Sequence, residues 1–169
     1  MANRSKSVPR LDPIDLRILG VLQQDGRITK LALAEKVGLS PTPCWERLKK
    51  LERAGIIAAY HARISLKALG PVTTVLAEIT LRSHTQADFQ RFEAAVQEIP
   101  EIVSCWATGG GVDYVLKLVT RDIDAYQRLI DSMLTSGLGI DRYFTYIVTK
   151  PVKDAPVLPL DKLVEPTRR

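Results

Sequence analysis

The residues best suited to bind a ligand are four cations between positions 47 and 53. Arg47, Lys49, Lys50 and Arg53 lie close together in the sequence. At about 3.6 residues per turn, Lys49, Lys50 and Arg53 would project from roughly one side of a helix. Their ammonium and guanidinium groups could neutralise the phosphates of a nucleic acid backbone. Alone, a basic amphipathic helix is more often a solvated surface helix, so the neighbouring residues must decide.

The surrounding segment carries the signals of a helix that buries its other side. Ser40 can cap the first turn with its hydroxyl, and Pro41 suits the first helical position. Gly55 supplies the left-handed residue that ends a helix. The apolar residues at helical spacing are Cys44, Leu48 and Leu51. A helix with one buried and one basic side suits the major groove of DNA.

Residues near the start of this helix could contact the edges of DNA bases. The candidates are Ser40, Thr42, Trp45 and Glu46. Trp45 could instead pack against a neighbouring helix, and both interpretations stay open. Phosphate contacts are expected from Arg47, Lys49, Lys50 and Arg53.

Two further helices are predicted before this one. Asp12-Pro13 begins the first, which ends at Asp25-Gly26, and Thr29 can cap the second, which ends at Gly38. The tight turn between Gly38 and Ser40 indicates a helix-turn-helix. Residues 56–64 follow as a short strand or wing.

The charge of the chain supports a nucleic-acid-binding N-terminal domain. Residues 1–65 hold 12 Lys and Arg against 6 Asp and Glu, a net charge of +6. Residues 66–150 hold 8 against 10, and residues 151–169 hold 4 against 3. The positive charge is therefore concentrated where the helix-turn-helix is predicted, as expected for a domain that binds a polyanion.

Other classes of protein find little support in the composition. No apolar run approaches the roughly 20 residues that span a bilayer, and no signal core follows the N-terminus. Cys44 and Cys105 form no disulfide framework, which favours the cytoplasm. Neither cysteine has a metal-ligand spacing with His61 or His84. With no nucleophile motif or phosphate loop, we expect neither enzyme activity nor a cofactor.

The second half of the chain predicts a ferredoxin-like domain. Strands are expected around residues 75–81, 102–108, 112–119 and 140–148, and helices around 89–96 and 122–134. Their order is βαββαβ, which makes the chain α+β. Two helices would cover one face of the sheet, and a second copy of the chain could cover the other.

Four segments follow from these patterns. We expect a helix-turn-helix domain over residues 1–65, a linker over 66–71 and a βαββαβ domain over 72–150. Residues 151–169 hold four prolines and are expected to be extended or mobile, and they could lie on another subunit.

Three glycines and an acid form a second candidate site. Gly109, Gly110 and Gly111 could expose backbone amides to a carboxylate, and Asp113 could pair with an ammonium group. Together they would match both charged groups of a free amino acid. A simple hairpin turn is the alternative, with Asp113 a solvated residue at the start of a strand.

Residues 11–150 closely resemble the Lrp/AsnC family of transcription regulators. The resemblance rests on the string Val37-Gly-Leu-Ser-Pro-Thr-Pro-Cys44 and, less specifically, on Gly-x-x-Asp-Tyr at 110–114. It implies a winged helix-turn-helix, an amino-acid-sensing βαββαβ domain, and dimers that often assemble to octamers with effector between subunits. The effector residues that it implies are Ala107, Gly110, Asp113, Tyr114, Ile123, Tyr146, Ile147 and Val148. Gly111 stands where many members of the family have an Asp, so the resemblance does not imply which effector this chain binds.

The favoured function is a sequence-specific DNA-binding regulator that responds to an amino acid or related metabolite. Some tetrapyrrole-modifying decarboxylases resemble this architecture and are one alternative, for which His61 or His84 could be proposed to bind a haem-like cofactor. The basic face of the third helix speaks against an enzyme. A mainly architectural, nucleoid-like DNA-binding protein is another alternative.

Overall fold

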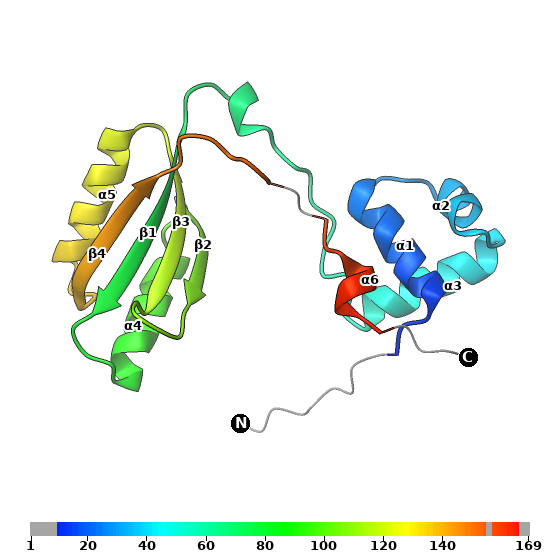
Figure 1. Ribbon diagram of the computed structural model, residues 1–169, viewed down its shortest axis with the longest axis horizontal. Coiled ribbons are helices and arrows are strands. Elements are labelled where there is room, and N and C mark those ends of the chain that lie inside the picture. The colour runs from blue at the N-terminus through cyan, green and yellow to red at the C-terminus, as the bar shows by residue number, and fades with distance from the viewer. Residues whose placement is uncertain (1–9, 155–156, 166–169) are drawn as a thin grey trace. The chain divides into compact units, whose positions relative to one another are not determined.

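The structure is a computed structural model that describes residues 10–154 and 157–165. These residues form two compact units (Figure 1). The first unit combines the residues up to Arg63 with the C-terminal segment from Lys153, and the second is Ile64–Val152. Along the sequence, the second unit is therefore inserted between two parts of the first. In the described part of the chain, no helix is both long and apolar enough to cross a membrane.

Three helices build the first unit. They are α1 (Pro13–Gln24), α2 (Lys30–Val37) and α3 (Pro41–Arg53). Ile18, Leu33 and Leu51, one from each helix, belong to a single buried apolar cluster. Gly38 ends α2 with a φ of +72°, a conformation that glycine adopts readily, and α3 begins only three residues later. The predicted helix-turn-helix is thereby confirmed.

The start of α1 is fixed by a reciprocal cap. The Asp12 carboxylate accepts hydrogen bonds from the amides of Ile14 and Asp15, and the Asp15 carboxylate accepts the amide of Asp12. The Thr29 hydroxyl accepts the amide of Ala32 at the start of α2, as its sequence predicts.

The predicted cap of α3 was wrong in one respect. Ser40 precedes the helix, but its side chain makes no capping hydrogen bond. A capping side chain accepts from the second or third amide of a helix, and the third residue here is Pro43, which has no N–H. Pro41 does occupy the first position, and Gly55 has a φ of +72° after the last turn.

The segment after α3 also differs from its prediction, because residues 56–64 contain no strand. Ile56 and Ile57 pack against the apolar cluster of the helices instead. The Tyr60 hydroxyl donates a hydrogen bond to Glu52 on α3. A strand needs a neighbour for its amides and carbonyls, and the described residues of this unit form no other strand.

The C-terminal segment folds onto the first unit rather than remaining extended. Its short helix α6 (Leu160–Leu163) contributes Leu160, which packs against the apolar cluster together with Val164. The Leu158 amide donates to the Gln23 side chain across 2.6 Å, and the Gln23 amide nitrogen donates back to the Leu158 carbonyl across 3.3 Å. Prolines suggested an extended tail, but the apolar residues between them provide a docking surface.

The second unit has the predicted βαββαβ order. After a 3-10 turn at Leu66–Ala68, its elements are β1 (Thr73–Leu81), α4 (Gln86–Gln97), β2 (Ile102–Ala107), β3 (Tyr114–Thr120), α5 (Ile123–Thr135) and β4 (Ile140–Ile147). The strands form one antiparallel sheet in the order β2-β3-β1-β4 (Figure 1). This arrangement confirms the ferredoxin-like prediction.

The two faces of the sheet differ in burial. Alternate residues of β1, such as Val75 and Ile79, are buried with Phe92 of α4 and Ile130 of α5 in one core. The opposite face is open. Its large side chains that are about half exposed are Trp106, Phe144 and Tyr146. The helices therefore cover one face of the sheet and leave the other available to a partner.

Candidate functional site

The predicted recognition helix, α3, has the two-sided character that its sequence suggests. Its buried side chains are Cys44, Leu48 and Leu51. The exposed candidates for DNA contact are Ser40, Thr42, Glu46, Lys50 and Arg53. No ion pair found among the described residues involves Lys50 or Arg53. Their charges are therefore free to face a polyanion.

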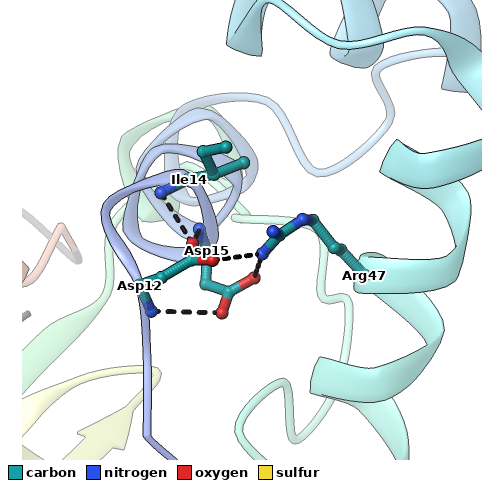
Figure 2. A network of polar contacts seen from close by, with 4 residues as sticks. All are labelled: Asp12, Ile14, Asp15 and Arg47. Carbon is teal, nitrogen blue, oxygen red and sulfur yellow. Dashed lines mark hydrogen bonds and ion pairs between the residues drawn. The ribbon is translucent and has the colours of Figure 1, made fainter. Parts of the chain in front are cut away.

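Arg47 requires a correction, because its side chain points toward Asp12 and Asp15 at the start of α1 (Figure 2). One guanidinium nitrogen, Nη1, lies 2.7 Å from Asp12 Oδ2 and 2.7 Å from Asp15 Oδ1. Burial opposes ionisation of Asp12, but hydrogen bonds from the Asp15 amide and from Arg47 outweigh it and lower the pKa of Asp12. Arg47 thus joins α3 to α1, and we remove it from the expected phosphate contacts.

Trp45 is half-buried and packs beside the apolar cluster of the first unit. Two ammonium groups lie near its ring: Lys30 Nζ is 3.4 Å and Lys49 Nζ is 4.9 Å from the ring centroid. The packing interpretation of Trp45 therefore has structural support, whereas a contact to bases stays a prediction. Sequence reasoning missed Lys30, because it lies on another helix and no local spacing links it to Trp45.

In the second unit, the Asp113 carboxylate already has partners. Its Oδ2 accepts the Leu81 amide across 2.8 Å and lies 3.1 Å from His84 Nε2. The side chain is 18% exposed. Asp113 therefore holds the end of β1 through the protein's own groups, and a ligand ammonium group would share this carboxylate with them.

The glycine loop before Asp113 leaves its backbone accessible. Gly109, Gly110 and Gly111 are exposed, and a Cβ on any of them would meet no atom within 4 Å. Gly110 has a φ of +143°, a backbone conformation that residues other than glycine rarely adopt. Both interpretations of the sequence, a turn and a site of ligand approach, fit this geometry.

Tyr114 belongs to the core more than to an open site. Its side chain is almost fully buried, its ring centroid lies 4.6 Å from that of Phe92, and its hydroxyl donates to Glu93. Burial, followed by the hydrogen bond to Glu93, raises the pKa of Tyr114. Tyr114 is also one of the residues that line a groove of about 270 Å³. The residues that line this groove are Glu93, Val96, Gln97, Cys105, Ala107 and Tyr114.

Sequence reasoning included Ala107 and Tyr114 but missed the α4 residues of this groove. Glu93 lies on α4 and accepts the Tyr114 hydroxyl. Helical periodicity distinguishes buried from exposed positions, but it does not show which strand a polar residue will face. No sequence signal marked Glu93.

The candidate effector residues form two groups at opposite ends of the sheet. Tyr114 pairs with Ile79 of β1, whereas Ile147 pairs with Val75. Four residues of strand separate these pairs, or about 13 Å. The group at the Ile79 end is Ala107, Gly109, Gly110, Gly111, Asp113 and Tyr114, and the group at the other end is Ile123, Tyr146, Ile147 and Val148. One chain therefore does not bring all of these residues around one small ligand.

Family models match most of both units. A model described as a winged helix-turn-helix DNA-binding domain matches residues 11–58. A model described as the Lrp/AsnC ligand binding domain matches residues 74–158. The second match alone covers half of the 169-residue chain.

Relatives with assigned roles match nearly the whole chain. The transcriptional regulatory protein DoeX of Halomonas elongata is 54% identical over 144 residues, which are 85% of this chain and 91% of DoeX. A leucine-responsive regulatory protein of Salmonella typhimurium is 42% identical over 145 residues, which are 86% and 88% of the two chains.

Solved structures agree with these matches. A transcriptional regulator of Neisseria meningitidis in complex with L-Met has a TM-score of 0.85 and 36% identity, covering 91% of this chain and 99% of that one. An AsnC family regulator of Agrobacterium tumefaciens has a TM-score of 0.85 and 34% identity, covering 91% and 100%.

Proposed function

Because the chain belongs to the Lrp/AsnC family of DNA-binding transcription regulators, we propose that it acts as a homo-oligomer whose DNA binding or assembly changes when an amino acid or related metabolite binds. The main support for DNA binding is helix α3, which has one buried side and one exposed basic side. Three of its side chains anchor it in the core, and its opposite side exposes the cations Lys50 and Arg53. A helix held in this way can enter the major groove as a rigid body.

We divide the contacts of α3 by chemistry. Lys49, Lys50 and Arg53 are proposed to contact phosphates, which sets affinity without selecting a sequence. Near the start of the helix, Ser40, Thr42 and Glu46 are exposed and carry the hydrogen-bonding groups that can select base edges.

The open face of the sheet supports a dimer. Trp106, Phe144 and Tyr146 expose large aromatic surface there, and a second copy of the same face would bury it symmetrically. Two subunits would present two recognition helices to a pseudo-palindromic site. Assembly beyond the dimer, as in octamers, belongs to the same proposal.

The division of the effector residues into two groups supports a site between subunits. Residues at opposite ends of one sheet can surround a single ligand if a partner contributes one of the groups. At the glycine loop, the amides of residues 109–111 would receive the carboxylate, and Asp113 would accept the ammonium group. The L-Met complex and the leucine-responsive relative support an α-amino acid as the ligand class.

We propose that the protein has no catalytic role. We also propose that it is located in the cytoplasm, where the chromosome is accessible. The relatives named above are regulators, and this favours the same assignment over the decarboxylase alternative.

A selection of genomic DNA fragments by the purified protein, with and without a pool of amino acids, tests the function. Enrichment of a few sites, with a change on adding amino acids, is expected. Even coverage of the genome would support an architectural protein instead. A strong Soret band together with no retained DNA would support the enzyme.

A further inference from the structure

Two lysines from different helices converge on one aromatic ring in the first unit. Lys30 is the first residue of α2, and its Nζ lies 3.4 Å from the centroid of the Trp45 ring. Lys49 lies on α3, and its Nζ is 4.9 Å from the same centroid. The two ammonium nitrogens are therefore at most 8.3 Å apart, the sum of these distances. Both distances are within the roughly 6 Å over which a cation and an aromatic face attract.

Neither ammonium group of this cluster is held in an ion pair with a carboxylate in the described part of the chain. Their maximum separation is close to the Debye length of about 8 Å at physiological ionic strength, so salt screens their repulsion only partly. The dipole of α2 also disfavours a cation at the position of Lys30. The Trp45 ring offsets part of this cost, and a bound anion would offset more.

We propose that Lys30, Trp45 and Lys49 form one phosphate-binding site for the backbone of duplex DNA. The ring holds both ammonium groups in place before DNA binds, which reduces the conformational entropy lost on association. The Lys30 side chain is exposed and that of Lys49 is half-buried, so both ammonium groups can reach a ligand. Trp45 is then a positioning residue that acts through the lysines and does not contact base edges.

This inference rests on DNA binding by the first unit, and it adds Lys30 and a role for Trp45 to the residues proposed above. Phosphate contacts do not depend on base sequence, so a random-sequence duplex is a suitable probe. Failure of the wild type to bind any duplex would contradict the proposed function itself. Binding that is independent of the cluster would contradict only the inference.

The first test measures fluorescence anisotropy of the full-length protein with that duplex at several KCl concentrations. Lys30→Gln and Lys49→Gln should each weaken binding and reduce the slope of log K against log salt by about 0.9 for each phosphate that the variant no longer neutralises. Lys150→Gln removes an exposed lysine of the second unit and is the matched control, which should retain the wild-type slope. Wild-type slopes in both cluster variants would overturn the inference.

A double-mutant cycle tests the positioning role. Trp45→Leu should weaken binding about tenfold in the wild type but have little effect in the Lys30→Gln/Lys49→Gln background, because the ring acts through these groups. Equal losses in both backgrounds would show that Trp45 acts by packing or by base contact. Thermal unfolding checks that Trp45→Leu is folded, and Trp45→Phe keeps a ring and should retain most of the affinity.

Fluorescence provides a readout that needs no change at Trp45. In a Trp106→Phe background, Trp45 is the remaining tryptophan. DNA binding should change its emission, because the ammonium groups engage phosphate, and this change should be lost in Lys30→Gln/Lys49→Gln at saturating DNA. An undiminished change in that variant would contradict the proposed site.

Discussion

The Arg47 guanidinium donates a hydrogen bond of 2.7 Å to the Asp15 carboxylate and thereby joins α3 to the first turn of α1 (Figure 2). The Asp15 side chain is 3% exposed and also accepts the amide of Asp12. One carboxylate therefore completes a helix cap and fixes the recognition helix. The sequence presents Arg47 as one of four neighbouring cations, yet only the structure shows that two carboxylates of the protein hold its guanidinium group.

Arg47→Gln should destabilise the first unit by about 2–4 kcal/mol, because two partly buried carboxylates lose their counter-ion. Denaturant unfolding followed by Trp45 fluorescence in a Trp106→Phe background measures this loss. Under conditions where the variant is folded, its DNA binding should keep the wild-type salt slope. A reduced slope would mean that Arg47 contacts phosphate after all.

The docked C-terminal segment should contribute to the stability of the first unit. Leu160 is half-buried against the apolar cluster, whereas Leu163 on the same helical turn is 63% exposed. Leu160→Ala should lower the free energy of unfolding by about 1–2 kcal/mol, and Leu163→Ala should change it by less than about 0.5 kcal/mol. The same fluorescence measurement applies. Equal effects of the two substitutions would show that this segment is not docked in solution.

A charge on the open sheet face should weaken assembly. Phe144 is 47% exposed in the single chain, and a symmetric partner would bury it. Phe144→Asp should therefore shift the full-length protein toward monomer in light scattering, since a buried unpaired carboxylate is costly. Leu134, which is 39% exposed on α5 on the other side of the sheet, is the control position. If Leu134→Asp dissociates the oligomer and Phe144→Asp does not, the interface lies on the helices.

Effector binding should depend on the charge of Asp113 and not on its neighbour His84. Asp113→Asn keeps an acceptor for the Leu81 amide but removes the charge that would hold a ligand ammonium group. Affinity should fall roughly tenfold to a hundredfold, as measured by calorimetry with a panel of amino acids and diamino acids. His84→Ala removes the other partner of Asp113 and should preserve binding. If Asp113→Asn binds a panel member as tightly as the wild type, the site lies elsewhere.

Local signals in the sequence predict most of the fold. Pro41 and Gly38 mark a helix start and end, and alternation along residues 75–81 marks a strand with one buried face. These signals act within a few residues, so a single sequence reveals them. The order of the elements then leads to the βαββαβ fold.

Local signals in the sequence do not predict contacts between residues that are far apart along the chain. The carboxylates that hold Arg47 precede it by 32 and 35 positions, and no spacing rule links them. Lys30 and Trp45 meet only because α2 and α3 pack together. Likewise, the separation of Tyr114 from Ile147 depends on strand register, which periodicity alone does not specify.

The salt dependence of DNA binding tests the central claim most directly. Wild type and the triple variant Lys49→Ala/Lys50→Ala/Arg53→Ala are titrated with a DNA fragment at several salt concentrations in gel-shift assays. If α3 contacts phosphates, the variant binds more weakly to every sequence, and its slope is shallower by roughly 1 for each phosphate that a subunit no longer neutralises. A variant that binds with the wild-type slope would show that α3 is not the phosphate-contacting element, and the proposed DNA-binding surface would be wrong.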